Sequence, residues 1–367
     1  MNLSSLLTYI TSLISQDPET YSQKSAKDLF ADLTSQAVED ICNQVKQIFK
    51  DEDILLNLEG DFIVVGDLHG HFFDLIRIFN HFGLPSQQKY IFLGDTIDRG
   101  EFSLYTILSI FVMKCSFPSS IYIIRGNHEF ENYNSGLSEE INELFHINGK
   151  NTMMTINQAF SYLPLAIVLN NEYLCVHGGI GPSFNDINQI CNITRPFVSI
   201  YGGIANSLLW SDPNENIDTF HESRRGVGYE YGYQAIKLFL KNNNLKMLIR
   251  GHEVVKEGVS YSLEKTVVTV FSASNYCGEL NNSGGVLIIK KGSPEKIFTF
   301  PPITPYVTRV KQTSRDTDTI KTKITPHRNS SNGRTVLLVP KMQGFKPISS
   351  LPTQRRKRVH SHSALPV

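Results

Sequence analysis

The chain has 367 residues, with 41% hydrophobic residues and equal numbers of basic and acidic side chains, 35 of each. This composition is typical of a globular protein with a sizeable core. No apolar stretch approaches the roughly 18 residues that a membrane helix needs, and the first basic residue is Lys24, so we expect neither a membrane span nor a secretory signal. The cysteines are odd in number and form no CxxC pair, which argues against a disulfide framework or thiolate zinc site and favours the cytoplasm or nucleus. They are Cys42, Cys115, Cys175, Cys191 and Cys277.

Residues 1–60 are expected to be helical. Apolar residues recur there every three or four positions with polar residues between them, which is the pattern of an amphipathic helix. The apolar face comprises Leu29, Leu33, Ala37, Ile41, Val45 and Ile48. We expect this segment, taken as 1–50, to pack on the main domain rather than to form a site of its own.

From Phe62 onward, short β-branched or aromatic runs alternate with helical stretches, which predicts an α/β domain. The early strands should be parallel and covered on both faces, because their runs are continuously apolar. Later runs follow one another more closely, which predicts an added antiparallel portion. The runs are FIVV (62–65), YIFL (90–93), IYII (121–124), YLCV (173–176), KMLI (246–249), TVVTVF (266–271) and GGVLIIK (284–290).

The basic residues are concentrated at the C-terminal end. Residues 303–367 hold 13 Lys and Arg against two Asp, whereas 1–302 hold 22 basic and 33 acidic residues. This tail is rich in Ser, Thr and Pro, which predicts disorder, apart from the apolar run TVLLVP (335–340), which could pair with a strand or a partner. Two interpretations stay open: a solvated linker, or an address for acidic proteins, nucleic acid or, through RRKR (355–358), nuclear import.

Polar residues follow five of the predicted strands at the point where each strand ends. Because ligands bind outside the carboxyl ends of strands in open α/β sheets, we expect these side chains to line one crevice. Taken singly, each Asp or His is better explained as a turn, cap or core residue, but five separate turns have no structural reason to choose the same chemistry. The residues are Asp67 and His69 (GDLHG), Asp95, Asp98 and Arg99 (GDTIDRG), Asn127 and His128 (RGNHE), His177 (HGG) and His252 (RGH).

Oxygen and imidazole ligands without cysteine suit Mn, Fe or Zn. The set exceeds the roughly three protein ligands of one catalytic metal, so we expect two divalent ions that share a carboxylate and act on a phosphoryl group. Arg99 and Arg225, each in a glycine-flanked turn, add planar cationic groups suited to phosphate. The residues together predict metal-assisted hydrolysis of a phosphate ester.

The motifs GDxHG, GDxxDRG and GNHE, followed by HGG and RGH, resemble those of the metallophosphoesterases. LLWSDP (208–213), RGVGYEYG (225–232) and FSASNYCGE (271–279) narrow the resemblance to the phosphoprotein-phosphatase family of serine/threonine phosphatases, and CGELNNSGG (277–285) is most similar to its type-1 branch. The resemblance implies a catalytic domain at 51–302 with a metallophosphoesterase fold. That fold is α/β with four layers, in which a central β-sandwich of mixed sheets is flanked by helices.

The resemblance also implies how two metal ions are held. One would be bound by Asp67, His69 and Asp95. The other would be bound by Asp95, Asn127, His177 and His252, with Asp95 bridging. A hydroxide between the ions would attack phosphorus directly, and we expect Mn²⁺ to support activity in vitro.

Further roles follow from the same resemblance. His128 would protonate the leaving serine or threonine oxygen, and Asp98 would hold its imidazole in the useful tautomer. The residues implied to contact the substrate are Arg99, Asn127, Arg225 and Tyr276, the last on a loop that overhangs the site.

The chain departs from the family pattern at several positions. Ser274 replaces the proline of SAPNY, which should make the overhanging loop less stiff. Arg224 stands where type-1 enzymes have an acid, and Ser207 also replaces an acid, so an acidic groove for basic substrates should be weaker. The region from Ile297 to Phe300 differs too, so regulatory subunits are expected but their docking sites are not identified.

Three functions are therefore weighed. The first is hydrolysis of phosphoserine and phosphothreonine esters in proteins. The second is hydrolysis of dinucleotide polyphosphates or other small phosphoesters, a group not expected to carry LLWSDP together with SxNYCGE. The third is a non-catalytic binding protein that acts through its basic tail, against which the complete set of metal ligands argues.

Overall fold

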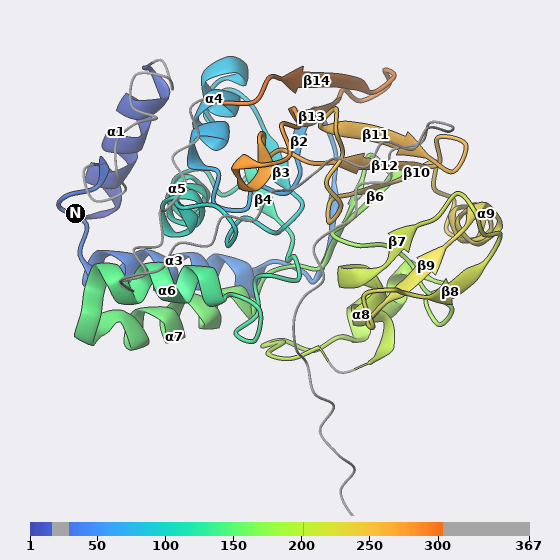
Figure 1. Cartoon of the computed structure of the whole chain (residues 1–367), viewed down its shortest axis with the longest axis horizontal. Coiled ribbons are helices and arrows are strands. Elements are labelled where there is room, and N and C mark those ends of the chain that lie inside the picture. Colours follow the sequence, from blue (N-terminus) through green and yellow to red (C-terminus); the bar gives the residue numbers. More distant parts are fainter. Residues whose placement is uncertain (17–28, 201, 304–367) are drawn as a thin grey trace, which may run out of the picture. The chain divides into compact units, whose positions relative to one another are not determined.

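Two mixed β-sheets face each other at the centre of the fold (Figure 1). The computed structural model describes residues 1–16, 29–200 and 202–303. In the five-stranded sheet, β2, β3 and β4 are parallel, and β13 and β14 are added antiparallel, as the sequence predicts. The order is β14 (Lys296–Phe300), β13 (Gly284–Ile289), β2 (Phe62–Val65), β3 (Tyr90–Phe92) and β4 (Ile121–Ile123).

The facing sheet has six strands. Its central pairs, β6 with β10 and β10 with β12, are parallel, while β5 pairs antiparallel with β6 and β11 antiparallel with β12. The order is β1 (Leu55–Leu58), β5 (Ala166–Leu169), β6 (Tyr173–Val176), β10 (Met247–Arg250), β12 (Val267–Val270) and β11 (Val259–Ser262).

Helices and a small sheet cover the outer faces of the two sheets (Figure 1). Six helices share one hydrophobic core with the five-stranded sheet: α1 (Leu3–Ile14), α3 (Ser35–Asp51), α4 (Phe72–Phe82), α5 (Ser103–Ser116), α6 (Ser135–Phe145) and α7 (Gly149–Phe160). The other face carries α8 (Gly203–Trp210), α9 (Tyr233–Asn242) and the sheet of β7 (Asp212–Pro213), β9 (Tyr229–Tyr231) and β8 (Phe220–Glu222). The predicted four-layer α/β sandwich is thus confirmed.

The continuously apolar strands are explained by burial on both faces. In β2, Phe62 and Val64 join the core between the sheets, whereas Ile63 and Val65 join the core beneath the helices. Successive side chains of a strand point to opposite faces, so a strand in an inner layer needs an apolar residue at every position. Each of the seven predicted strand runs overlaps a strand of the structure.

The amino-terminal prediction is partly wrong. Helix α3 begins after Thr34, whose side chain accepts a hydrogen bond from the Ala37 N–H at 3.3 Å, so Leu33 lies before the helix. Its apolar side is buried against α5 and α7, as expected. Residues 55–58, however, form strand β1 rather than helix, because they pair in parallel with β5 along the edge of the six-stranded sheet. The predicted tail lies outside the described residues except for Ile303.

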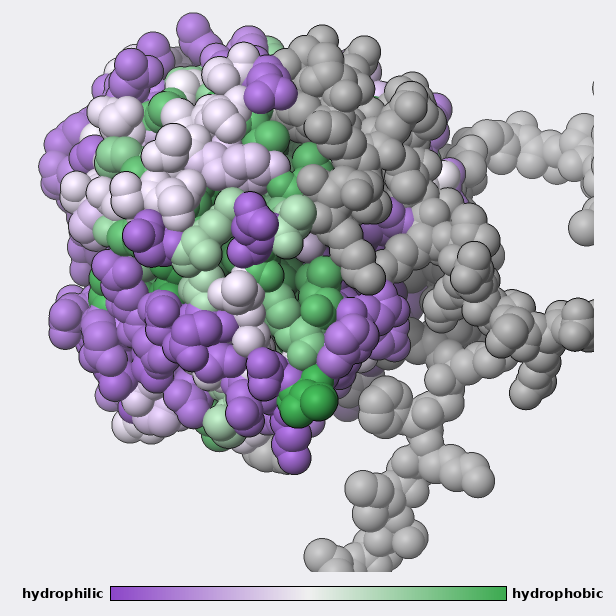
Figure 2. All heavy atoms as spheres, turned by 90° about the vertical axis from the view of Figure 1, so that its left-hand side faces the viewer, coloured by the Kyte–Doolittle hydropathy of each residue, from purple (hydrophilic) through white to green (hydrophobic). Residues whose placement is uncertain are grey.

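The helical side of the molecule is turned toward the viewer in Figure 2. Hydrophilic residues dominate the lower part of this face, and apolar residues gather near its middle. None of the described helices is both long and apolar enough to cross a membrane.

A buried lysine joins α5 to the strand that follows it. Lys114 is fully buried and forms an ion pair with Glu52. Its ammonium group also donates to the carbonyl oxygens of Pro118 at 2.9 Å and Ile121 at 2.7 Å. Burial lowers the pKa of Lys114 and raises that of Glu52, and their mutual attraction opposes both shifts. The pair therefore offsets a large desolvation cost.

Replacing Lys114 by Met should destabilise the protein by about 3 kcal/mol, because the change leaves Glu52 and two carbonyl oxygens without their cation. Urea denaturation followed by circular dichroism measures the loss. The double substitution Lys114→Met with Glu52→Gln is the control and should recover part of it, since no unpaired carboxylate remains. A double variant less stable than Lys114→Met would contradict this explanation.

Candidate metal centre and active site

Five strands deliver the predicted site residues to one edge of the sandwich. Strands β2, β3 and β4 of one sheet lead into Asp67, Asp95 and Asn127, and strands β6 and β10 of the other lead into His177 and His252. The two sheets come together here, because Asp67 forms a parallel bridge with Phe271 just beyond β12. The predicted crevice residues therefore lie close together although they are far apart in the sequence.

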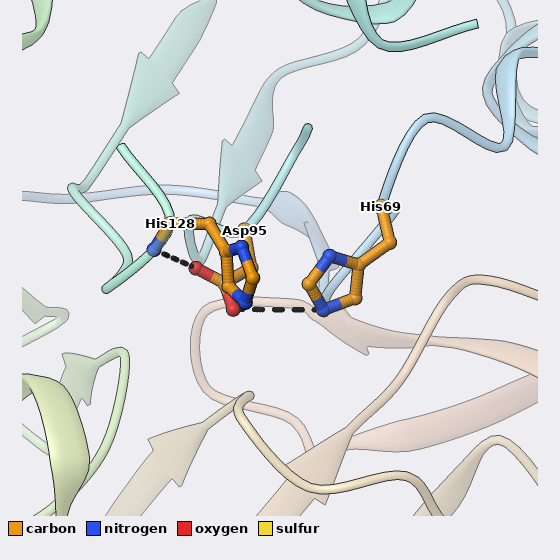
Figure 3. Close-up of side chains that lie close together, drawn as sticks. All are labelled: His69, Asp95 and His128. Atoms are coloured by element: carbon orange, nitrogen blue, oxygen red, sulfur yellow. Dashed lines mark hydrogen bonds and ion pairs between the residues drawn. The ribbon is translucent and has the colours of Figure 1, made fainter. Parts of the chain in front are cut away.

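Asp95 is the residue at which the two halves of the site meet. One of its oxygens, Oδ2, lies 3.5 Å from His69 Nε2 and 3.4 Å from His177 Nε2. The other, Oδ1, accepts the backbone N–H of His128 at 2.9 Å (Figure 3). A buried carboxylate placed between two imidazoles suits the shared ligand that the sequence predicts.

Backbone carbonyls fix how the first two imidazoles face this carboxylate. His69 Nδ1 lies 2.8 Å from the Ile97 carbonyl oxygen, and His177 Nδ1 lies 2.9 Å from that of Leu93. A carbonyl oxygen only accepts, so each Nδ1 carries a proton, and in the neutral imidazole the Nε2 atom that faces Asp95 is the one left free to bind a metal. Metal-binding histidines are commonly oriented by such bonds.

The remaining groups converge on His177. Its Nε2 lies 2.9 Å from Asn127 Oδ1 and 3.2 Å from His252 Nδ1. One buried oxygen nearby, Asp67 Oδ2, has no hydrogen-bond partner. A buried carboxylate oxygen without a partner, beside clustered ring nitrogens and an amide oxygen, is costly unless a cation lies among them, so the residues fit divalent metal ions.

Two groups of side chains in the described part of the chain have the spacing of metal ligands. One is Asp95, His177 and His252, and the other is His69, Asp95 and His128, with the ligand atoms in each group within 4.8 Å of one another. Asp67 Oδ2 lies 3.7 Å from His69 Nε2. His128 therefore lies close enough to the predicted metal site of Asp67, His69 and Asp95 to bind a metal there, whereas the sequence predicts that it donates a proton and binds no metal.

Burial and mutual attraction shift the acidity of these groups in opposite directions. Burial raises the pKa of Asp67 to about 7 and lowers that of His69 to about 3. Burial alone would raise the pKa of Asp95, but neighbouring histidines, His177 first, hold it well below its usual range. Burial likewise opposes protonation of His177, yet Asp95 raises its pKa to about 9. The carboxylates thus draw positive charge into the site, which is what a divalent cation supplies.

His128 and Asp98 form a close pair at the margin of the site. Asp98 Oδ2 accepts from His128 Nδ1 at 2.6 Å, and its Oδ1 accepts the Leu137 N–H at 2.8 Å. Burial by itself would lower the pKa of His128, but Asp95 and Asp98 outweigh it and raise the pKa above its ordinary value. The protonated imidazole is therefore favoured, with its orientation set by Asp98.

The two predicted phosphate-binding arginines lie at the surface. Arg99 is exposed, and Arg225 donates from Nε to Asp212 Oδ2 at 2.6 Å, which fixes its direction. Tyr276 places its ring 5.3 Å from that of His69. Burial raises the pKa of the Tyr276 hydroxyl well above its usual value, so it stays a neutral donor.

Several site residues have an unusual backbone conformation. A positive φ is uncommon outside glycine and is strained, yet it occurs at His69 (42°), Asp95 (48°), Asp98 (66°), Arg99 (69°) and His252 (70°). Gly126 permits a close approach in the same region, since a Cβ there would lie 2.3 Å from Asp95 Oδ1. The glycine between β4 and Asn127 is thus needed for the chain to turn into the site.

Two residues that support the site have no role predicted from the sequence, although both lie within its motifs. Glu129 of GNHE is buried, and its carboxylate accepts the backbone N–H groups of Asp95 at 2.9 Å, Thr96 at 2.8 Å and Gly126 at 2.8 Å. Asp212 of LLWSDP binds Arg225 and the buried Arg250 through different oxygens. Both are acidic residues within a motif that are not predicted to bind a metal, and this is the feature of the sequence that could have indicated a supporting role.

The expectation that Ser274 loosens the overhanging loop is not supported by its contacts. Ser274 is buried, and its N–H and hydroxyl donate to Asp74 at 2.7 Å and 3.1 Å. These bonds offset the loss of the proline ring. Arg224, by contrast, is 88% exposed, with Glu230 3.4 Å away. Ser207 is buried in α8.

Paired metal-ligand groups at the strand ends of a four-layer α/β sandwich define the class of a metallophosphoesterase. The sequence model of the calcineurin-like phosphoesterases matches residues 60–256. The chain belongs to the calcineurin-like phosphoesterase family, which confirms the resemblance seen in the motifs.

Solved structures agree with this assignment. A protein serine/threonine phosphatase from Saccharomyces cerevisiae, described as similar to human phosphatase PP5, shares 31% identity with a TM-score of 0.69. The match covers 74% of this chain and 91% of that one. A cold-active protein tyrosine phosphatase shares 14% identity with a TM-score of 0.50, covering 68% and 82%, and shows likeness of fold alone.

Proposed function

We propose that the protein is a serine/threonine protein phosphatase that hydrolyses phosphoserine and phosphothreonine esters. The observation that carries the proposal is that His69 and His177 both lie within 3.5 Å of Asp95 at the strand ends. It is supported by the match to a serine/threonine phosphatase, which covers 74% of this chain and 91% of that protein.

In this proposal one metal ion is held by Asp67, His69 and Asp95, and a second by Asp95, Asn127, His177 and His252. Such a pair, when bound, polarises phosphoryl oxygens and supplies an activated water for direct displacement. Arg99 and Arg225 then bind the phosphoryl oxygens, and Arg225 is directed by its bond to Asp212. Planar guanidinium groups suit this task because they present paired N–H donors.

The leaving group is handled by the chain itself. His128, whose protonated form is favoured by its pairing with Asp98, donates its proton to the departing serine or threonine oxygen. Asp98 holds Nδ1–H at 2.6 Å, so the proton passed on is the one at Nε2. Tyr276 lies over the site and contacts the substrate.

We further propose a cytoplasmic or nuclear location, supported by the five cysteines, which are all free. Regulatory subunits and contacts of the basic tail with acidic partners are proposals that rest on the sequence.

The protein should be stripped with EDTA and reloaded with Mn²⁺, then assayed on a phosphoserine peptide and on a dinucleotide polyphosphate. We expect peptide hydrolysis that is lost on stripping and restored by Mn²⁺. Hydrolysis of the nucleotide alone would favour a small-phosphoester hydrolase. Failure on both substrates by the reloaded protein would favour a binding protein.

A further inference from the structure

Ser274 lies where three segments of the chain meet. Its N–H and hydroxyl donate to the carboxylate of Asp74 on α4. Its hydroxyl oxygen also accepts the backbone N–H of Ile303 at 3.2 Å. Ile303 lies three residues beyond β14 and is the first residue of the basic tail and the last described residue of the chain. Neighbouring Asn275 strengthens the link, since its side-chain amide donates to the Ile303 carbonyl at 3.4 Å.

The same serine begins the part of the loop that lies over the site. We call residues 271–283 the Tyr276 loop. Its interior is held by Asn282, which accepts the Tyr276 N–H at 2.8 Å and donates to the Ala273 carbonyl at 2.8 Å. Because Asn282 braces the loop internally, the bonds of Ser274 tie the loop as a unit to its surroundings.

Tyr276 is in turn enclosed by rings on the site side. Its ring centroid lies 5.1 Å from that of Phe271, 5.3 Å from His69 and 6.1 Å from His71. His71 Nδ1 is 3.6 Å from Asp74, the carboxylate that holds Ser274. The position of Tyr276 over the site therefore depends on the contacts that Ser274 makes at the base of the loop.

We propose that Ser274 is a positioning residue that holds the Tyr276 loop between α4 and Ile303 and so couples substrate binding to the C-terminal segment. This rests on the proposed function, in which Tyr276 contacts the substrate. Proline, which the family pattern has at this position, lacks both the N–H and the hydroxyl and could make none of these bonds. A partner that draws Ile303 away would release one side of the loop.

Hydrogen–deuterium exchange of the full-length protein tests the coupling without a substrate. Ile303→Pro removes the N–H that Ser274 accepts, while Ile303→Ala keeps it and serves as the matched control. Exchange of the peptide spanning 273–283 should be about fivefold faster in Ile303→Pro, the equivalent of one hydrogen bond. It should be at least as much faster in Ser274→Ala, which also loses the hydroxyl's bond to Asp74. It should be unchanged in Ile303→Ala.

The double variant Ser274→Ala with Ile303→Pro completes a cycle, and its exchange should be no faster than that of Ser274→Ala. Exchange rates that are equal in Ile303→Pro and Ile303→Ala, or effects that multiply in the double variant, would overturn the coupling.

Kinetics supply a second test. In Ser274→Ala and Ile303→Pro, KM for a phosphopeptide should rise about fivefold, again the equivalent of one hydrogen bond, with little change in kcat. KM for p-nitrophenyl phosphate, which is too small to reach far along the loop, should be unchanged. An equal effect on both substrates would mean that Ser274 acts only on general stability. If the unsubstituted protein hydrolyses neither substrate, the proposed function fails, and the exchange data still decide the coupling.

Discussion

Replacing Asp95 by Asn should lower phosphopeptide hydrolysis by about 10³-fold or more. Removing a single oxyanion-hole donor already costs about 10²–10³-fold in other hydrolases, and this change removes the negative charge shared by both proposed metal positions. Asn keeps an oxygen for the His128 N–H bond at 2.9 Å. Its amide group, however, would face the lone pairs of His69 and His177, which lie 3.5 Å and 3.4 Å from Oδ2.

The measurements are kcat on a phosphoserine peptide and metal content by inductively coupled plasma mass spectrometry after Mn²⁺ loading. We expect both to fall, while circular dichroism stays that of the unsubstituted protein. Asp51→Asn, at an exposed carboxylate at the end of α3, controls for loss of charge and should change neither. Full metal content with full activity in Asp95→Asn would refute the bridging role.

The sequence predicts the inner strands well because burial on both faces leaves a continuous apolar run. It fails at β5, whose run Ala166–Leu169 is just as apolar. The turn that follows contains Asn170 and Asn171, both with positive φ, and this dipeptide was the available hairpin signal. Strand β1 was not predicted because its residues continue the helical pattern before them. Its strand conformation depends on pairing with β5, which is a tertiary contact.

The same division applies to the site. Ligand residues were predictable because each follows its strand directly. Glu129 was not, since it acts on the backbone N–H of Asp95, 34 residues earlier in the chain. At Ser274 the local prediction was misleading. The loss of proline suggests a more flexible loop, but Ser274 donates hydrogen bonds to Asp74, 200 residues away, which no local sequence pattern shows.

Replacing His128 by Asn should lower kcat by about 10²–10⁴-fold, the usual contribution of a general acid, and should leave the metals bound. The contrasting change is Asn127→Ala at the neighbouring residue, which should weaken metal binding because Asn127 Oδ1 lies within the ligand cluster, 2.9 Å from His177 Nε2. Activity on the phosphopeptide and metal content, measured on both variants, separate the two roles.

The geometry also allows the alternative that His128 is a metal ligand, since it lies in a group with His69 and Asp95 at metal-ligand spacing (Figure 3). Its Nδ1, however, is bound to Asp98 at 2.6 Å, and this carboxylate favours the protonated imidazole. In its protonated form the imidazole cannot bind a metal but can donate a proton. Asp98→Asn should therefore also lower kcat with the metals retained, because the orienting carboxylate is lost. If His128→Asn empties the metal site, His128 is a ligand and another group must protonate the leaving oxygen.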